Sequence, residues 1–295
     1  MEISLPKDKT YIVAISGGVD SMVLLDLLVD AHHANNWNLV IAHVDHGIRS
    51  DSGQDKDLVA TVAKKHNLVF EFTQLSLGEA TSEQVARVKR YEFLDRLARD
   101  YKASAIVTAH HEDDLIETAI INIIRGTGRK GLTSLVNNPH RLRPLISYSK
   151  ADIISYARKA NLVWREDTTN ADQKYLRNYI RINIIPKLND SARSKFVAIL
   201  NNMSILNLEL DDILDKLIKQ QPDNQLDKLW FSLLPNAVAK EVLAAWFRHN
   251  NLAGFNKLTL ERLVVSAKVA RVKQRFPIYS GTYLIINKST LSLSK

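Results

Sequence analysis

The chain has 295 residues, of which 45% are hydrophobic and 24% charged, and none is cysteine. This composition is typical of a globular protein with one large domain and a smaller one. The lack of cysteine excludes disulfides, thiolate metal sites and iron–sulfur clusters held by these residues. No apolar run approaches the roughly 18 residues of a membrane span, and residues 1–10 lack the apolar core of a secretion signal. We therefore expect a cytoplasmic protein with no membrane partner.

The formal charge of +8 is distributed unevenly along the chain. Residues 1–124 carry 12 basic against 19 acidic side chains, whereas residues 125–187 carry 13 against 4 and residues 188–295 carry 15 against 9. Phosphate groups are bound by lysine and arginine, so the middle and C-terminal parts are candidates for contact with nucleic acid. A solvated basic face is an equal alternative from charge alone.

Over the first 125 residues, short apolar runs alternate with helical patterns. Strands are predicted at 11–15, 39–44, 69–75 and 105–109, and helices at 21–34, 51–65, 82–101 and 112–125. The alternation predicts the α/β class, with a mainly parallel, doubly wound sheet. In such a sheet, ligands bind outside the carboxyl ends of the strands.

The C-terminal part has a different pattern. After residue 189 the sequence is largely helical, with amphipathic stretches at 196–220 and 237–250, and short strands with a turn at Ser280-Gly281 are predicted over 275–294. We therefore predict an α/β catalytic domain at 1–187 and a smaller, mostly helical domain at 188–295.

The segment Ser16-Gly-Gly-Val-Asp-Ser21 joins the first predicted strand to the first predicted helix. Adjacent glycines allow a sharp turn that presents backbone N–H groups to an anion, and the helix adds its positive end. The two serine hydroxyls can donate to phosphate oxygens, and Asp20 can hold magnesium. A Walker loop would add a lysine after its last glycine, and its absence disfavours P-loop kinase chemistry. The loop predicts a polyphosphate site; a turn without ligand is the alternative.

Polar side chains follow two further predicted strands. Histidines can accept protons near pH 7, and carboxylates can hold magnesium or an ammonium group. Capping of the following helix is a nearly equal alternative for each aspartate of the second group, and a satisfied loop histidine pair is the alternative for the first. The residues are His43, Asp45 and His46 after one strand, and His110, His111, Asp113 and Asp114 after the other.

Residues 126–131 read Gly-Thr-Gly-Arg-Lys-Gly and match the string of dinucleotide-binding loops. That fingerprint must follow a strand, whereas this one follows a predicted helix. We interpret the segment, with Arg125, Arg129 and Lys130, as a flexible basic loop that contacts phosphates. A plain surface loop is the alternative.

Three further basic groups are candidates for phosphate contact. Arg87 and Arg90 lie three apart on one predicted helix face, with salt-bridged surface arginines as the alternative. Arg177 and Arg181, near Tyr175 and Tyr179, form a basic and aromatic face, with solvated arginines on a tyrosine-packed helix as the alternative. The stretch 257–275 holds six basic residues and one acid, and a charged helix face is its alternative. The candidates in that stretch are Arg271 and Arg275.

Seven blocks, in order along the chain, resemble one known family. SGGVDS at 16–21 is similar to the pyrophosphate loop of the N-type ATP pyrophosphatases. Within that superfamily, six more blocks resemble the tRNA(Ile)-lysidine synthases: HVDHGIR at 43–49, ARVKRY at 86–91, TAHHEDDLIET at 108–118, RGTGRKGLTSL at 125–135, RPLI at 143–146 and EDTTNADQKYLRNYIR at 166–181. Family members often carry a longer C-terminal extension, so this chain resembles a short form.

The resemblance implies a ligase that uses ATP and magnesium. The C2 oxygen of the wobble cytidine in a CAU-anticodon tRNA(Ile) is adenylated, and free L-lysine then displaces AMP to form lysidine. The implied ATP-binding residues are Ser16, Gly17, Gly18, Val19, Asp20 and Ser21, with Asp20 as the magnesium ligand. The implied catalytic residues are Asp45, His110, His111, Asp113 and Asp114, and the implied tRNA-binding residues are Arg87, Arg90, Arg125, Arg129, Lys130, Arg177, Arg181, Arg271 and Arg275.

Rival interpretations remain open. A related tRNA thiolase or a glutamine-dependent synthetase would depend on cysteines, which are absent. A non-catalytic, ATP-dependent tRNA-binding protein is the rival from another class, and release of AMP would discriminate against it. A homodimer is also left open.

Overall fold

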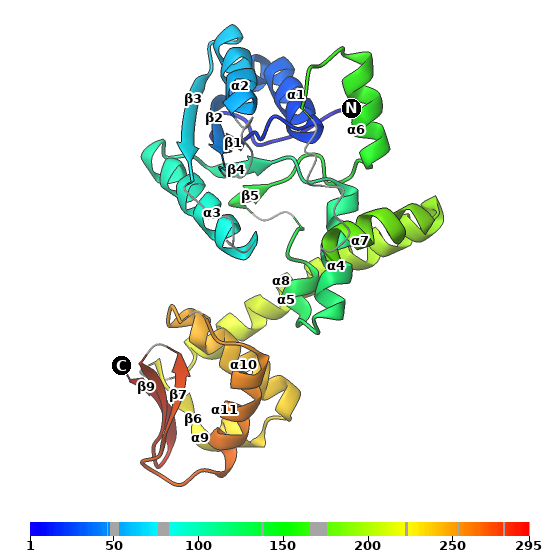
Figure 1. Ribbon diagram of the computed structural model, residues 1–295. Coiled ribbons are helices and arrows are strands. Elements are labelled where there is room, and N and C mark those ends of the chain that lie inside the picture. The colour runs from blue at the N-terminus through cyan, green and yellow to red at the C-terminus, as the bar shows by residue number, and fades with distance from the viewer. Residues whose placement is uncertain are drawn as a thin grey trace. The chain divides into compact units, whose positions relative to one another are not determined.

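The computed structural model describes residues 1–45, 47, 53–75, 83–136, 139–165, 176–221, 224–252, 254–279 and 281–294. The chain forms two compact units (Figure 1). The first comprises Met1–Arg125 and Thr133–Leu200, and the second comprises Gly126–Leu132 and Asn201–Lys295. Our assignment of two domains that meet at residues 187 and 188 stays a prediction.

The first unit is built on a five-stranded parallel sheet with the order β3-β2-β1-β4-β5. The predicted parallel sheet is therefore confirmed, and the short last strand was not predicted. Because β1 lies between β2 and β4, the strand order reverses beside β1, and a crevice forms there at the carboxyl ends. The strands are β1 (Thr10–Ala14), β2 (Asn38–Asp45), β3 (Val69–Gln74), β4 (Ala105–Thr108) and β5 (Arg141–Leu142).

Helices cover both faces of this sheet, as Figure 1 shows. Tyr11 and Val13 of β1 belong to the core with α1, α2 and α6, whereas Ile12 between them packs with α3 on the other face. Alternation along a strand therefore divides its apolar side chains between two layers, and the doubly wound arrangement is confirmed. The helices are α1 (Val19–Asn35), α2 (Gly53–Lys65), α3 (Glu83–Asp100) and α6 (Lys150–Lys159).

A second helical group lies at the end of the first unit. Ile116 and Ile121 of α4 pack with Ile180 of α7 and Ile185 of η2 in one small core. This packing brings the polar side of α7 beside α4, which begins just after β4. The elements are α4 (Glu112–Ile124), α7 (Leu176–Asn183), the 3-10 helix η2 (Ile185–Lys187) and the start of α8 (Asp190–Lys219).

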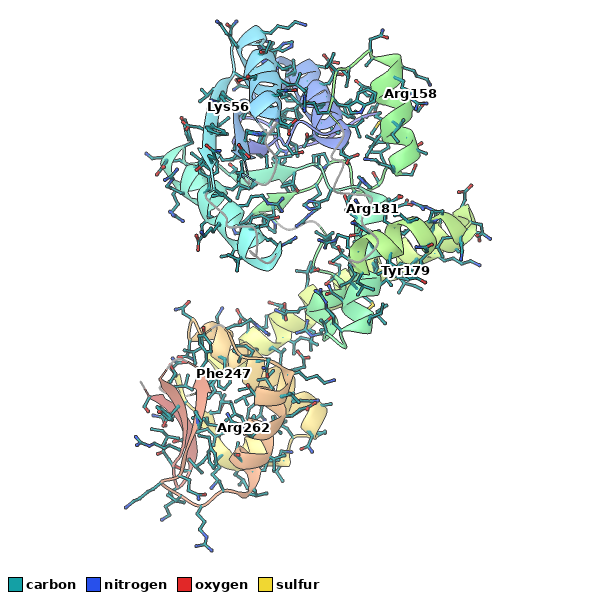
Figure 2. All side chains as sticks on the ribbon, viewed as in Figure 1. Lys56, Arg158, Tyr179, Arg181, Phe247 and Arg262 are labelled. Atoms are coloured by element: carbon teal, nitrogen blue, oxygen red, sulfur yellow. The ribbon has the colours of Figure 1, made fainter. Side chains whose placement is uncertain are left out.

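The second unit combines helices with a four-stranded antiparallel sheet of order β6-β9-β8-β7. Phe231, Trp246 and Phe247 are completely buried in its core. Arg262 of α11 donates a hydrogen bond to the carbonyl oxygen of Pro277 in β7; Figure 2 labels Phe247 and Arg262. The elements are α5 (Arg129–Leu132), the rest of α8, β6 (Leu226–Asp227), α9 (Lys228–Leu233), α10 (Asn236–His249), α11 (Lys257–Val269), β7 (Arg275–Tyr279), β8 (Thr282–Ile286) and β9 (Thr290–Ser294).

The helices and strands predicted after residue 189 are present. Among the described residues, no helix has both the length and the apolar character that a membrane span requires.

Candidate active site at the carboxyl ends of the strands

The loop between β1 and α1 is closed by one serine hydroxyl. Ser21 Oγ accepts hydrogen bonds from the backbone N–H groups of Ser16 (3.2 Å) and Gly17 (3.1 Å), and it donates to the carbonyl oxygen of Gly18 (2.8 Å). Gly17 has φ of +91°, and a Cβ there would lie 3.3 Å from Cβ of Asp55. A residue with a side chain at position 17 would therefore be strained and crowded.

The loop leads directly into the first turn of α1. Gly18 is the N-cap of this helix and offers no side-chain acceptor to its first N–H groups. Those N–H groups, including those of Val19 and Asp20, lack intrahelical acceptors and are available to an anion. The loop therefore has donors that suit a phosphate, and the binding of a polyphosphate there stays a prediction.

A cavity of about 230 Å³ lies beside this loop, at the carboxyl ends of β1, β2 and β4. One part of its wall is polar and includes Ser16, Asp20 and Ser21 of the loop. Another part is apolar and is formed by alanine, valine, leucine and isoleucine side chains from the ends of β1 and β4, from β2 and from α3. The remaining lining residues are Ala14, Ile15, Ala42, Val44, Arg90, Leu94, Thr108, Ala109, His110 and Asp114.

A second cavity of about 210 Å³ shares Arg90, His110 and Asp114 with the first. Four of the predicted phosphate-contacting arginines line it, from α3 and α7. The carboxylates that line the same cavity belong to Asp114 and Glu117 of α4. The other lining residues are Ala86, Arg87, Glu117, Thr118, Leu135, Arg177 and Arg181.

The arginines of α7 are held by a buried acid. Glu117 is 1% exposed, and its carboxylate accepts hydrogen bonds from Nε of Arg177 (2.5 Å) and Nε of Arg181 (3.0 Å). Arg181 also lies 3.3 Å from Asp114. Both arginines are thus ion-paired as well as partly exposed, and their contact with tRNA stays a prediction. Tyr175 lies outside the described residues.

The arginines of α3 differ from those of α7. Arg87 and Arg90 both lie over the ring of Tyr91, each 5.3 Å from its centroid. Within the described part of the chain, neither is paired with a carboxylate, so the salt-bridged alternative finds no support there. Their positive charge faces the second cavity.

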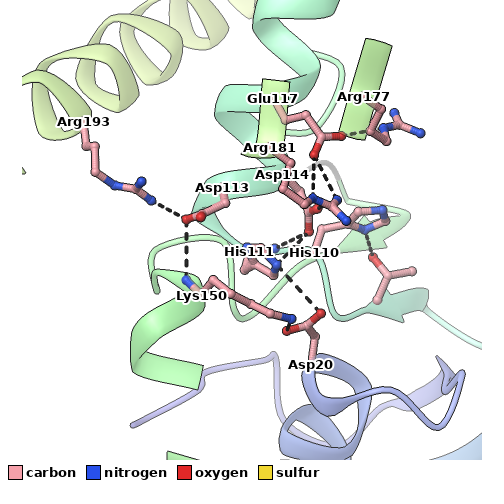
Figure 3. A network of polar contacts seen from close by, with 11 residues as sticks. Asp20, His110, His111, Asp113, Asp114, Glu117, Lys150, Arg177, Arg181 and Arg193 are labelled. Atoms are coloured by element: carbon pink, nitrogen blue, oxygen red, sulfur yellow. Dashed lines mark hydrogen bonds and ion pairs between the residues drawn. The ribbon is translucent and has the colours of Figure 1, made fainter. Parts of the chain in front are cut away.

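A polar network connects α4 with the phosphate loop (Figure 3). His111 is buried, and its Nε2 lies 3.4 Å from Asp114 Oδ2 and 3.8 Å from Asp20 Oδ2. Asp114 Oδ2 also accepts a hydrogen bond from the backbone N–H of His111 (3.1 Å). Burial raises the pKa of Asp114, but the two histidines, this N–H group and Arg181 outweigh it, so the net pKa is lowered. Asp114 is therefore a carboxylate at neutral pH.

His110 stands at the wall between the two cavities. Its Nδ1 lies 2.8 Å from Oγ1 of Thr108. Burial lowers the pKa of His110 to about 3; Asp114 opposes this shift, whereas Arg143 and Arg90 reinforce it. The ring is therefore neutral at pH 7, which suits it to accept or donate a single hydrogen bond to a bound substrate.

Asp113 is engaged differently from Asp114. Arg193 of α8 forms ion pairs with both Glu112 (2.9 Å) and Asp113, and the backbone N–H of Lys150 donates to Asp113 (3.5 Å). Asp113 lines neither cavity. Its catalytic role stays a prediction, and its contacts are those of a residue that ties three helices together.

His43 and Asp45, at the end of β2, also line neither of the two cavities. The ring of His43 is bonded through Nδ1 to the carbonyl oxygen of Ile15 (2.8 Å), and it stacks on Phe72. Asp45 accepts a hydrogen bond from the backbone N–H of Gly47 (2.8 Å). These contacts favour the satisfied-histidine alternative for His43. His46 lies outside the described residues.

The predicted flexible basic loop at 126–131 is wrong in part, because Arg129–Leu132 form the helical turn α5. The guanidinium of Arg129 is bonded to Glu241 (3.0 Å), Asp211 (2.7 Å) and Asn207 (3.0 Å). Lys130 lies 2.7 Å from Asp211. This segment is thus fixed within the second unit by ion pairs.

The other predicted tRNA contacts are exposed at the surface. Arg125 is the C-cap of α4, in the first unit. Arg271 and Arg275 belong to the second unit, where the Arg275 guanidinium lies 5.3 Å from the ring centroid of Tyr283. Their role in binding tRNA stays a prediction.

Three residues of the network were not singled out from the sequence. Lys150 lies 2.5 Å from Asp20, and Glu117 orients the arginines of α7. Arg143 is 2% exposed and lies near Arg87, one of the arginines that line the second cavity. A signal existed for Lys150: Ser149 and Asp152 have the spacing of a helix N-terminus, where a lysine is unfavourable unless an anion is near.

The chain matches the PP-loop domain over residues 2–188, which is more than half of its length, and it therefore belongs to the PP-loop family. It is 39% identical over 193 residues to the tRNA(Ile)-lysidine synthase of Exiguobacterium sibiricum, a match that covers 63% of this chain and 45% of that protein. It is 35% identical over 213 residues to the tRNA(Ile)-lysidine synthase of Thermotoga maritima, covering 69% and 51% respectively. The chain spans about half the length of these two relatives.

A solved structure shares the fold. The U34-tRNA thiolase NcsA of Methanococcus maripaludis superposes with a TM-score of 0.58 at 19% identity, over 68% of this chain and 73% of that one. The predicted fold class is thereby supported by a second, independent comparison.

The residues at the loop fit a magnesium ion that arrives with a nucleotide. Carboxylates of Asp20 and Asp114 approach the same nitrogen of His111 from two helices. Magnesium is usually held by one or two carboxylates together with substrate phosphates. Among the described residues, no cluster of three or more histidine, aspartate or glutamate side chains that could hold a metal ion is present.

Proposed function

We propose that the protein ligates L-lysine to the wobble cytidine of a CAU-anticodon tRNA(Ile) in the cytoplasm, at the expense of ATP. The observation that carries the proposal is a pair of adjoining cavities that share Arg90, His110 and Asp114. One cavity adjoins the phosphate loop and the other is lined by arginines. The similarity to curated tRNA(Ile)-lysidine synthases supports tRNA(Ile) as a substrate, and the PP-loop domain supports the use of ATP.

The first half of the reaction activates a poor leaving group. The C2 carbonyl oxygen of cytidine forms a bond to the α-phosphorus of ATP. The bond from that phosphorus to the bridging oxygen breaks, and pyrophosphate leaves with the electron pair. The loop at Ser16–Ser21 is suited to bind the polyphosphate, because its N–H groups and hydroxyls are donors at a helix N-terminus.

The second half replaces AMP with lysine. The neutral ε-amine of lysine forms a bond to C2, and the C2–oxygen bond breaks so that AMP leaves; the amine loses its proton to an acceptor in the site. Asp114 can bind an ammonium group, and neutral His110 can accept a hydrogen bond. His111 connects Asp114 with Asp20 and is suited to keep both carboxylates in position.

Asp20, with Asp114 nearby, would hold a magnesium ion, which supplies positive charge to shield the triphosphate. The apolar wall formed by Ala14, Ala42 and Leu94 is suited to a flat base.

The tRNA would be bound mainly through its phosphates. Arg87 and Arg90 have no carboxylate partner in the described chain and lie at the cavity that a flipped or unstacked anticodon base would enter. Exposed Arg125, Arg271 and Arg275 are suited to contact other phosphates of the tRNA. Arg129 and Lys130, which are ion-paired with acids, are weaker candidates than the sequence indicates.

The test is to incubate the purified protein with ATP, magnesium, radiolabelled lysine and CAU-anticodon tRNA(Ile). An elongator tRNA(Met), which has the same anticodon, is the matched substrate control. Acid-stable label on tRNA(Ile) alone, resistant to mild deacylation, is the expected result. AMP release without label would support another nucleophile, and neither label nor AMP would favour the non-catalytic tRNA-binding alternative.

A further inference from the structure

A lysine ammonium lies against the phosphate loop, although the loop itself contains no lysine. Nζ of Lys150 lies 2.5 Å from Oδ1 of Asp20, a residue 130 positions away in the chain. Figure 3 shows the Lys150 side chain extending from the start of α6 to the carboxylate of Asp20 in the first turn of α1. The side chains of Lys150 and Asp20 are 37% and 30% exposed, so a ligand can reach both.

The position of Lys150 is fixed by the helix that carries it. Ser149 is the N-cap of α6, and its hydroxyl accepts a hydrogen bond from the backbone N–H of Asp152 (3.2 Å). One turn further, the hydroxyl of Tyr156 donates to Asp26 of α1 (2.8 Å). Helix α6 also contributes buried side chains to the core that contains α1. Helices α1 and α6 are therefore packed together, which fixes the start of α6, and with it Lys150, beside the first turn of α1.

The location of this lysine is unfavourable without an anion. A cation in the first turn of a helix is repelled by the positive end of the helix dipole, and Lys150 is the first residue of α6. One carboxylate, that of Asp20, offsets this repulsion. A bound polyphosphate would offer several more negative oxygens at the same place. In Walker loops a lysine at the comparable end of the glycine turn contacts the terminal phosphates.

We propose that Lys150 is the phosphate-binding lysine of this loop, supplied from α6, and that its ammonium group binds the β- and γ-phosphates of ATP and the pyrophosphate that leaves. Asp20 holds the ammonium in position before the nucleotide arrives. When the bond between the α-phosphorus and the bridging oxygen breaks, negative charge grows on pyrophosphate, and the ammonium donates hydrogen bonds to it. The assignment of this step rests on the proposed function.

The test compares nucleotide binding by Lys150→Ala, Lys150→Arg and the matched control Lys159→Ala, an exposed lysine at the other end of α6. Calorimetric titrations with ATP, pyrophosphate and AMP, each with magnesium, measure the affinities. We expect Lys150→Ala to bind ATP and pyrophosphate about 10- to 100-fold more weakly while AMP affinity is unchanged. Lys150→Arg should restore part of the affinity, and Lys159→Ala should match the wild type.

Equal affinities of Lys150→Ala and wild type for all three ligands would overturn the proposal. An equal loss for AMP and ATP would also overturn it, because a merely structural lysine would not distinguish them by their terminal phosphates. The thermal midpoint of each variant identifies unfolding, and Lys150→Arg keeps the comparison valid if the alanine variant is unstable.

The binding titrations need neither tRNA nor lysine, so the two proposals can fail separately. A wild-type protein that makes no lysidine, with phosphate-selective loss in Lys150→Ala, would refute the proposed reaction and leave the Lys150 assignment standing. Lysidine formation by the wild type, with Lys150→Ala indistinguishable in binding and kcat, would refute the Lys150 assignment alone.

Discussion

The guanidinium of Arg181 lies 2.9 Å from the carboxylate of Glu117, and the acid is the buried member of the pair, with 2% of its side chain exposed against 36% for the arginine. Arg177 forms an ion pair with the same carboxylate, at 2.5 Å. Because the acid is fixed within α4 and the arginines belong to α7, Glu117 positions both guanidinium groups at the wall of the second cavity. It is therefore a positioning residue, and the cavity depends on it.

We expect Glu117→Gln to lower the free energy of unfolding by about 1–3 kcal/mol, because two guanidinium groups lose their charged partner in a partly buried site. Urea denaturation measures the change. Glu92→Gln, an exposed position on α3, serves as the matched control and should leave the unfolding curve in place. A Glu117→Gln variant as stable as the control would contradict the positioning role.

Gly17→Ala should abolish nucleotide binding. The turn requires a positive φ at position 17, which is strained for alanine, and the new Cβ would lie 3.3 Å from Cβ of Asp55. We expect the loop to move in response, which would displace its N–H groups. Gly128→Ala is the control, since a Cβ at Gly128 meets nothing within 4 Å. Fluorescence titration with a nucleotide analogue compares the two variants, and normal binding by Gly17→Ala would show that the loop tolerates a side chain there.

The lowered pKa of His110 predicts an acid-sensitive fold. In the folded protein the ring stays neutral down to a pKa of about 3, whereas in the unfolded chain it takes up a proton near pH 6.5. The unfolded state therefore binds more protons between these values, and stability falls as pH is lowered through that window, by at most about 1.4 kcal/mol per pH unit from this group.

Unfolding free energies at pH 7.5 and pH 5 test this expectation. The difference between the two pH values should be smaller in His110→Asn than in the wild type. The exposed His249→Asn should retain the wild-type difference. If His110→Asn keeps it as well, the histidine is not buried in its neutral form.

The Arg129 cluster predicts a stability role within the second unit. The planar guanidinium of Arg129 donates hydrogen bonds to Glu241, Asp211 and Asn207 at the same time. The compact ammonium group of lysine cannot reproduce that geometry. We expect Arg129→Lys to lower the free energy of unfolding by about 1–3 kcal/mol, whereas exposed Arg125→Lys should be neutral. Thermal unfolding of both variants measures the difference in stability. Equal unfolding midpoints would show that the hydrogen bonds of Arg129 do not stabilise the second unit.

The fold and the first half of the site follow from local patterns. Strand and helix periodicity predicts the parallel sheet, and the two glycines between Ser16 and Ser21, together with the two serine hydroxyls, predict the phosphate loop. The polar ends of β1 and β4 meet at one cavity because parallel strands place their carboxyl ends at the same edge.

The rest depends on contacts between distant residues. The pairs Lys150 with Asp20 and Arg177 with Glu117 are 130 and 60 positions apart, and no local spacing signals them. The composition of α5 predicts a basic loop, but its two basic side chains form ion pairs with acidic side chains of α8 and α10. Asp45 and His43 are predicted as site residues because they lie at the end of a strand. In the structure His43 is bonded to the carbonyl oxygen of Ile15 and Asp45 to the N–H of Gly47, and their role in the site stays a prediction.

Nucleoside analysis of the tRNA product shows whether this protein forms lysidine. CAU-anticodon tRNA(Ile) is incubated with the protein, ATP, magnesium and lysine, digested to nucleosides and examined by mass spectrometry, while AMP and pyrophosphate are quantified in the same reaction. We expect the wobble cytidine to be replaced by a cytidine derivative carrying one lysine, with one AMP and one pyrophosphate released for each modified tRNA. An unmodified wobble cytidine in a protein that binds both ATP and this tRNA would contradict the proposed function.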